Sequence, residues 1–204
     1  RQLLFGEGRS DGAGRAMRPF PPRPYDAERQ KRCSVASVQV RQAEISDIAQ
    51  LVNLQFEVYP PSDFPPVNRW GATQLEVHQK VFPAGQLVAV LDGRIVGSTT
   101  TMITTKERCE APHTFSGITG GARLRAHDPD GDALYGVDML VSPHFRGIGI
   151  ARRLYDARFA LQARLGLQGF YAGARIPGYA AVADQLSAEE YLRLVLAGEL
   201  SDPT

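Results

Sequence analysis

The stretch Arg146-Gly147-Ile148-Gly149-Ile150-Ala151 decides the fold of this chain, because it joins two segments of different character. The apolar run from Leu134 to Val141 before it predicts a strand, and the run from Arg152 to Leu165 after it has the spacing of a helix. The first turn of a helix has backbone N–H groups with no partner inside the helix, and its dipole favours negative charge. Glycines allow the main chain to approach an anion closely. The junction therefore predicts a phosphate-binding turn, unless its glycines serve only the turn itself.

The spacing of the glycines distinguishes among phosphate-binding loops. The chain contains no Gly-x-x-x-x-Gly-Lys-Ser/Thr sequence, which excludes a nucleoside-triphosphate loop of that kind. A dinucleotide fingerprint needs a third glycine where this chain has Arg152. What remains is Arg146-x-x-Gly149-x-Ala151, preceded by Leu140-Val141-Ser142-Pro143. This sequence resembles the acyl-CoA pyrophosphate loop of the GNAT N-acyltransferase superfamily, whose pattern is Gln/Arg-x-x-Gly-x-Gly/Ala.

The resemblance implies that the turn binds the pyrophosphate of an acyl-CoA, with acetyl-CoA as the first candidate and another acyl-CoA as the alternative. The implied cofactor-binding groups are the charges of Arg146 and Arg152 and the backbone N–H groups of Gly147, Ile148, Gly149, Ile150 and Ala151. Either arginine could instead be an ordinary surface residue.

In this superfamily the strand before the turn diverges from its neighbour. The resemblance assigns the main-chain groups that are then free for the pantetheine arm to Met139, Leu140 and Val141. An N–H near Met139 or Leu140 would face the oxygen of the thioester. The side chains of these residues are expected to be ordinary core.

Hydrophobic periodicity and turn signals predict the remaining elements. A strand over 37–43 leads into a helix that is capped by Ser46 and ended by Pro60, and a second helix covers 73–82. Strands over 86–91 and 94–104 form a hairpin through Asp92-Gly93, and residues 105–132 are predicted to be a long connection. After the turn come a helix with Leu154, Ala157, Leu161 and Leu165 on one face, a strand over 170–174, and a helix with a Ser187–Glu190 capping box.

This element order is that of the GNAT fold, so the resemblance runs from about Val38 to the end of the sequence. It implies the α+β class, with a mixed, mostly antiparallel central sheet flanked by helices. The superfamily normally continues with two further strands, which this sequence lacks. The expectation is therefore a fragment of a longer protein, or a homodimer that covers the sheet edge. Stretches within 175–179, 187–191 and 198–203 also resemble the GNAT module fused in front of carbon–nitrogen hydrolase domains.

Composition bounds the class of protein. Residues 1–36 are rich in Pro, Gly and Arg and predict a disordered arm, which leaves 37–204 as one GNAT-like acyl-CoA-binding domain. A net charge of +1 and scattered basic residues argue against nucleic acid as a partner. No apolar run is long enough to cross a bilayer and no signal-peptide core is evident, so the sequence predicts a cytoplasmic protein without a membrane partner. Cys33 and Cys109 predict reduced thiols, and the four histidines lack metal-ligand spacing, so no metal is expected.

Acyl transfer to an amine also needs a proton acceptor and a proton donor. Members of the superfamily often place a tyrosine that protonates the thiolate shortly after the fifth strand, which implies Tyr179. They often carry a carboxylate near the strand before the turn, which implies Asp138. Tyr179 could instead be a packing residue at a helix start, and Asp138 a polar residue that points away from the core.

Other residues are weaker candidates. Tyr135 and Glu57 are reserve candidates for the base, and Tyr59, Phe64 and Trp70 are candidates for the acceptor pocket unless they only cover an edge of the core. No cysteine or serine has an adjacent base suited to a covalent acyl-enzyme. The sequence therefore predicts an N-acyltransferase that moves an acetyl or related acyl group from acyl-CoA to an amine of a small molecule or peptide by direct attack. The alternative is a non-catalytic acyl-CoA-binding sensor, a regulatory module of a larger, hydrolase-fused protein.

Overall fold

A computed structural model defines the structure of residues 38–62, 65–66, 69–174 and 176–202. These residues form two compact units, one that ends at Ala172 and one that begins at Gly173. The arm predicted for 1–36 lies outside the described residues, as do Cys33, Phe64 and Arg175. The assignment of 37–204 to one domain stays a prediction.

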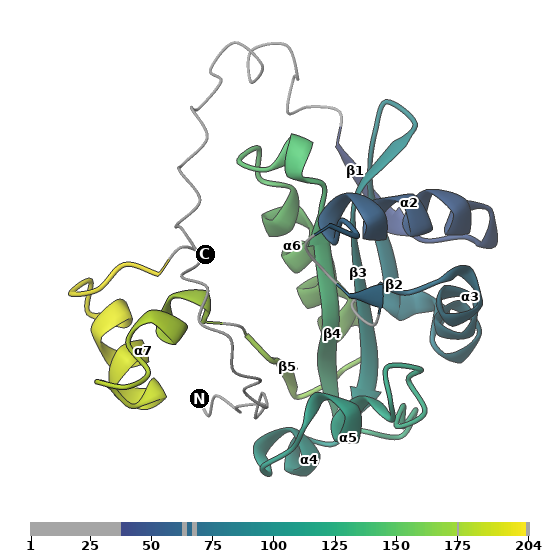
Figure 1. Cartoon of the computed structure of the whole chain (residues 1–204). Coiled ribbons are helices and arrows are strands. Elements are labelled where there is room, and N and C mark those ends of the chain that lie inside the picture. The colour runs from purple at the N-terminus through teal and green to yellow at the C-terminus, as the bar shows by residue number, and fades with distance from the viewer. Residues whose placement is uncertain (1–37, 63–64, 67–68, 175, 203–204) are drawn as a thin grey trace. The chain divides into compact units, whose positions relative to one another are not determined.

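The first unit is built on a five-stranded sheet with the order β1-β2-β3-β4-β5. Its strands are β1 (Gln39–Gln42), β2 (Gln86–Leu91), β3 (Arg94–Thr104), β4 (Ala133–Val141) and β5 (Gly169–Ala172). Neighbouring strands are antiparallel except β4 and β5, which are parallel. The predicted fold class, a mixed and mostly antiparallel sheet flanked by helices, is confirmed (Figure 1). Among the described residues no strand follows β5.

Helices cover both faces of this sheet. Helices α2 (Ile48–Val58) and α3 (Ala72–Val81) lie on one face, and α6 (Ile150–Arg164) lies on the other (Figure 1). Shorter helical segments connect these elements: η2 (Ile45–Asp47), η4 (Pro83–Gly85), α4 (Lys106–Glu110), α5 (Phe115–Thr119) and η5 (Pro143–Phe145).

Strand β2 is apolar from Leu87 to Leu91 because both of its faces are covered by helices. Leu87, Ala89 and Leu91 belong to the cluster that includes Leu154 of α6. Val88, which points the opposite way, packs in the cluster of α2 and α3. A strand between two helical layers is buried on both faces, so it needs apolar side chains at every position rather than at alternate ones.

The β2–β3 hairpin agrees with the sequence prediction. Both strands have the predicted bounds, and Asp92-Gly93 forms the turn with φ angles of 50° and 75°. Positive φ at both central residues matches the right-handed twist of the flanking strands, and Asp and Gly tolerate it better than other residues do.

Residues 105–132 are not the plain connection that was predicted, because they contain α4 and α5. Each helix begins at a threonine whose side-chain oxygen accepts a backbone hydrogen bond: Thr105 from the Arg108 N–H and Thr114 from the Gly117 N–H. Both threonines are N-cap signals. The helices that follow are too short for hydrophobic periodicity to reveal them.

The prediction that Ser46 caps the first helix was wrong. The chain enters through η2, whose capping box pairs Glu44 with Asp47. One carboxylate oxygen of Asp47 accepts the Glu44 N–H at 2.8 Å, and both accept from the Arg41 guanidinium, at 2.6 and 2.9 Å. The Arg41 bonds, with the backbone bond in support, hold the pKa of Asp47 below its ordinary value.

The second unit is described by itself. It contains η6 (Pro177–Ala181) and α7 (Ala188–Leu196). The predicted capping box between Ser187 and Glu190 is confirmed at the start of α7. Asp202 accepts hydrogen bonds from the Tyr191 hydroxyl at 2.8 Å and from the Gly178 N–H at 3.1 Å, so one carboxylate ties both elements together.

We expect Asp47→Ala to lower the free energy of unfolding by about 1–2 kcal/mol at pH 7, because it removes a helix cap and two bonds from Arg41. Ser46→Ala should change the free energy of unfolding by only about a few tenths of a kcal/mol, because Ser46 is exposed and its hydroxyl bonds the exposed Glu44 carboxylate. Urea unfolding of both variants measures the difference.

The pH dependence of this pair has a definite sign. A carboxyl group whose pKa is depressed by folding contributes stability above its unfolded value, and that stability is lost as the pH falls through the folded value. The difference in free energy of unfolding between wild type and Asp47→Ala should therefore be constant near neutral pH and become smaller below about pH 4. A difference that grows in acid would contradict the assignment.

Candidate functional site

Strand β4 separates from β5 halfway along its length. Residues Ala133 to Gly136 pair with Gly169 to Ala172, and this pairing ends at Gly136. Strand β4 continues to Val141 on the β3 side alone, and the two strands diverge (Figure 1). An edge of β4 backbone is therefore exposed beside its neighbour, as the resemblance implied.

A bulge lies in β4 at the point of separation. Thr100 pairs with Asp138 and Thr101 with Gly136, which leaves Val137 as the extra residue. Before the bulge, Gly136 faces α6 and Val137 faces the opposite side. After it, Asp138 also lies on that opposite side, while Met139 packs towards α6. The extra residue thus re-aims the Asp138 side chain, which is a common use of a bulge near functional sites.

The hydrogen-bond pattern of β4 shows which main-chain groups face the open edge. The Ser142 N–H donates to the Val96 carbonyl oxygen at 2.9 Å, so the backbone groups of Ser142 point towards β3. Alternation along a strand then points those of Leu140 towards β3 and those of Met139 and Val141 towards the open edge. Of the two N–H groups considered for the thioester oxygen, Met139 has the suitable direction.

The turn after β4 ends in the exposed N-terminus of α6. The Arg153 N–H donates to the Gly149 carbonyl oxygen at 3.2 Å, so the N–H groups of Ile150, Ala151 and Arg152 precede the first helical bond. Gly149 is the N-cap, with φ of 80°. These donors, at the positive end of the helix dipole, form an anion-binding arrangement.

The two glycines of the turn are required by backbone conformation and leave open space. Gly147 and Gly149 have φ of 82° and 80°, and a Cβ at either would have nothing within 4 Å. Both residues are exposed. An anion could therefore approach the main chain here, whereas any other residue would be strained.

The side chains of the turn divide into two groups. Arg146, Ala151 and Arg152 are exposed, so both arginines can add positive charge beside the helix terminus. Ile148 and Ile150 pack against the core instead, so only their main-chain atoms can contribute. The turn therefore fits a diphosphate, which needs main-chain donors and cations rather than side-chain pockets.

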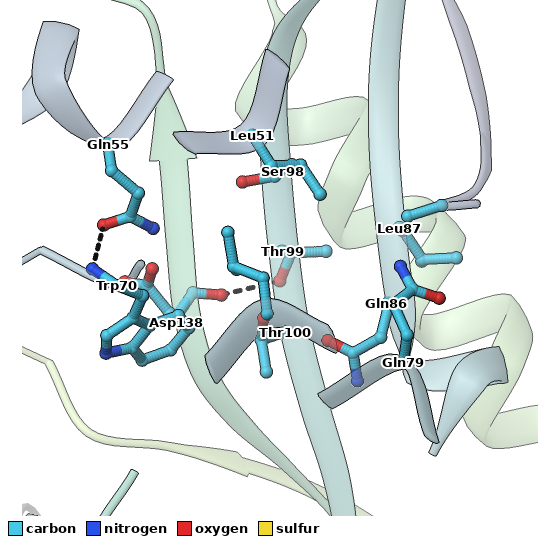
Figure 2. A pocket seen from close by; sticks show the side chains of 12 residues that line it. Leu51, Gln55, Trp70, Gln79, Gln86, Leu87, Ser98, Thr99, Thr100 and Asp138 are labelled. Carbon is cyan, nitrogen blue, oxygen red and sulfur yellow. Dashed lines mark hydrogen bonds between the residues drawn. The ribbon is translucent and has the colours of Figure 1, made fainter. Parts of the chain in front are cut away.

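A small pocket lies on the opposite face of the sheet from α6 (Figure 2). Residues of α2, α3 and strands β2 to β4 line it, including Leu51, Gln55, Trp70, Gln79, Gln86, Thr99 and Asp138. Beside the pocket, the backbone N–H of Trp70 donates to Gln55 Oε1 at 3.3 Å. The Thr99 hydroxyl donates to the backbone carbonyl oxygen of Asp138 at 2.8 Å (Figure 2). The pocket is thus partly polar and includes the predicted base.

The structure also locates two candidates for the acceptor pocket, Tyr59 and Trp70, and one reserve candidate for the base, Tyr135. Trp70 lines it, as predicted, but Tyr59 packs against the core cluster of α2 and is not part of the lining. Tyr135 is buried in the cluster of α4 and α5, with its hydroxyl 3.5 Å from His113 Nε2.

Glu57 is not suited to act as the base. One carboxylate oxygen accepts from Arg94 at 2.6 Å and the other from the Ser142 hydroxyl at 2.7 Å. It therefore ties α2 to the start of β3 and the end of β4. Both oxygens are already used in structural bonds.

Tyr179 lies in η6 of the second unit, where its ring packs 5.7 Å from that of Tyr191. The packing role considered for it is therefore present, and its catalytic role stays a prediction.

Sequence reasoning missed Arg158, which lies on the buried face of α6 with Ile150, Leu154 and Leu161. Leu165, which was predicted on this face, is 40% exposed. The signal was available in the spacing, because Arg158 follows Leu154 by four residues and precedes Leu161 by three. A charged residue at such a position has to be buried when the apolar stripe packs.

A metal-binding cluster and a membrane-spanning helix are both absent from the part of the chain that the structure describes. It contains no group of three or more histidine, cysteine or acidic residues that could hold a metal ion. None of its helices is long and apolar enough to cross a membrane.

The chain is similar to known proteins over most of its length. The model of the acetyltransferase (GNAT) family matches residues 45–183. The uncharacterized N-acetyltransferase YkwB of Bacillus subtilis (strain 168) is 38% identical over 164 residues, which cover 80% of this chain and 72% of YkwB. The probable hydrolase YhcX of the same organism is 34% identical over 164 residues, but the match spans only 31% of YhcX.

A solved structure agrees with these similarities. The GphF GNAT-like decarboxylase, in complex with isobutyryl-CoA, superposes with a TM-score of 0.66 at 25% sequence identity. The match covers 81% of this chain and 80% of that chain. Since the family model matches more than half of the sequence, and the diverging strands and glycine turn lie within that match, the chain belongs to the GNAT acetyltransferase family.

Proposed function

We propose that this protein is an N-acyltransferase that moves an acetyl or related acyl group from acyl-CoA to an amine. One observation carries the proposal. The open edge of β4 leads from the exposed N-terminus of α6 to Asp138, which lines the pocket on the other face. A donor bound along the edge and an acceptor in the pocket would meet at the bulge.

The donor would be held mainly by the main chain. The N–H groups at the start of α6 and the charges of Arg146 and Arg152 would bind the diphosphate. The backbone of Met139 and Val141 would pair with the amides of the pantetheine arm. Acyl-CoA supplies the activated thioester, and the Met139 N–H would donate to its oxygen as negative charge develops there.

The transfer step requires two proton movements. The amine nitrogen forms a bond to the thioester carbon, the carbon–sulfur bond breaks, and the leaving thiolate takes up a proton. Asp138 would accept the proton that the amine loses, directly or through water. The thiolate needs a proton donor, and Tyr179 of the second unit is the candidate that the family resemblance implies. Direct attack agrees with the state of Cys109, because burial raises the pKa of this thiol to about 11 and keeps it protonated near neutrality.

The pocket indicates the chemical character of the acceptor. The side-chain amides of Gln55 and Gln79 and the hydroxyl of Thr100 line it together with the ring of Trp70. This mixture suits a small molecule or a peptide end that offers hydrogen-bonding groups and some apolar surface beside its amine.

A non-catalytic acyl-CoA sensor is the second candidate, and the similarity to YhcX favours it. This chain matches about a third of that probable hydrolase, so a GNAT unit can be one part of a larger protein. Thiol release from acetyl-CoA over a panel of amines separates the two: turnover supports the transferase, and tight binding without turnover supports the sensor. Because GphF is a GNAT-like decarboxylase, release of CO₂ should be recorded in the same assay.

We expect Gly149→Glu to weaken CoA binding by about 100-fold or more, since it places a carboxylate where the diphosphate would bind. Gly166→Glu is the matched control at the other end of α6, with φ of 68° and a Cβ position that is equally open. Both variants carry similar backbone strain, so both should melt somewhat below wild type. Calorimetry with CoA decides the matter, and equal affinity of the two variants would reject the diphosphate site.

Asp138→Asn should lower kcat by about 100-fold or more while the Kd for acetyl-CoA stays close to that of wild type. The control is Asp92→Asn, because Asp92 is an exposed turn residue and asparagine also adopts its positive φ of 50°. Steady-state kinetics with the most active amine provide the measurement. Wild-type turnover in Asp138→Asn would remove this residue from the mechanism.

Tyr179→Phe should lower kcat by about 10-fold to 100-fold with little effect on acetyl-CoA affinity, because it removes the proposed proton donor. Tyr191→Phe is the control in the same unit, since it removes a hydroxyl that bonds Asp202. If both variants lose the same activity and the same stability, the hydroxyl of Tyr179 is structural.

A further inference from the structure

Arg158 is a buried cation in the apolar interior of the first unit. Only 2% of its surface is exposed, and it is the largest of the fully buried side chains among the described residues. It lies on the face of α6 that packs against the sheet, between Leu154 and Leu161. Most arginines at such positions are paired with a carboxylate.

The surroundings of the guanidinium place it at the point where β4 and β5 separate. A Cβ on Gly136, the last β4 residue paired with β5, would lie 2.6 Å from Arg158 Nη1. The Nη2 atom is 3.9 Å from Met139 Sδ, on the open part of β4. Arg158 Cζ lies 4.4 Å from the ring centroid of Tyr155 and 5.0 Å from that of Phe170 in β5.

These contacts leave the guanidinium without a hydrogen-bonded anion. Its Nε is buried and has no hydrogen-bond partner, and Arg158 forms none of the salt bridges found among the described residues. The Tyr155 hydroxyl contributes a side-chain hydrogen bond to the guanidinium, and Asp138 contributes a favourable charge. Burial lowers the pKa of Arg158, but a guanidinium remains charged at neutral pH.

A buried guanidinium without a carboxylate partner is destabilising, and the cation–π contacts offset only part of this cost. The cost would be recovered if an anion that is not part of the described chain bound the free Nε–H. The part of β4 that continues beyond its pairing with β5 lies next to the guanidinium, at Gly136 and Met139.

The position of Arg158 limits which anion this can be. Arg158 follows Ile150 by eight residues, which is about 12 Å along the helix, so it lies far from the diphosphate donors. It also lies on α6, whereas the acceptor pocket lies on the other face of the sheet. In the proposed donor site, the part nearest Arg158 would be the thioester end, next to Met139.

We propose that Arg158 binds a carboxylate on the acyl group, so that the donor is an acyl-CoA with a free carboxyl end, such as malonyl-CoA or succinyl-CoA. This inference rests on the proposed acyl-CoA site along β4. The planar guanidinium suits a carboxylate, and its contacts with the rings of Tyr155 and Phe170 hold it in position. The aromatic and methionine surroundings exclude water, which strengthens the pair.

Calorimetry on the wild-type protein gives the first test. We expect malonyl-CoA or succinyl-CoA to bind at least 10-fold more tightly than acetyl-CoA, and more tightly than acetoacetyl-CoA, whose acyl group is of similar size but uncharged. Equal binding of all four would overturn the inference and leave the proposed function intact. Binding of none would overturn both.

Two variants assign the preference to this residue. Arg158→Met replaces the guanidinium with an apolar side chain of similar length, and it should abolish the preference while acetyl-CoA affinity changes by less than about 3-fold. Arg164→Met, an exposed position on the same helix, removes the same charge and should keep the preference. A preference that survives in Arg158→Met would refute the assignment. If Arg158→Met does not fold, the comparison of malonyl-CoA with acetoacetyl-CoA on wild type still decides the question.

The carboxylate could instead belong to the acceptor, and the same proteins distinguish this case. Thermal stabilisation by a carboxylate-bearing amine such as glutamate should be the same in wild type and Arg158→Met. A loss of that stabilisation, together with unchanged malonyl-CoA binding, would assign Arg158 to the acceptor and overturn the proposal.

Discussion

Val137 has no partner across the β3–β4 ladder, and both faces of the candidate site depend on this extra residue. Without the bulge, Asp138 would alternate onto the α6 face and Met139 onto the pocket face. With it, Asp138 lines the pocket while the backbone of Met139 faces the opening between β4 and β5. Main-chain groups left without a strand partner need other hydrogen bonds. The pantetheine amides proposed to bind there would provide them.

The separation of β4 from β5 divides the chemistry between two environments. The face towards α2 and α3 is partly polar, with Asp138, Gln55 and Thr100 around a pocket that suits an acceptor. On the face towards α6, the buried cation Arg158 contacts the rings of Tyr155 and Phe170. A cation in apolar surroundings is selective for charge, because little water remains to screen it. In the proposed mechanism the pocket selects the acceptor, and Arg158 of α6 selects the acyl group.

Short sequence signals predicted the elements that are set by contacts between residues close together in the chain. The Asp92-Gly93 turn fixed the bounds of β2 and β3, and the Ser187–Glu190 box fixed the start of α7. The start of the first helix was misassigned, because Glu44 and Asp47 form the capping box there with the help of Arg41 from β1. Helices α4 and α5 were not predicted, because a helix of about one and a half turns is too short to show a hydrophobic period. The N-cap residues Thr105 and Thr114 were the available signal.

The sequence by itself determined the glycine turn before α6, the element order and the family, because glycine conformations and hydrophobic periods are properties of short segments. Tertiary structure alone decided that Glu57 is engaged by Arg94 and Ser142, that Asp138 faces the pocket, and that Arg158 is buried where two strands part. These outcomes depend on contacts between residues far apart in the chain. The register of β3 against β4, which pairs Thr100 with Asp138, is the physical reason for the second of them, and no local pattern encodes it.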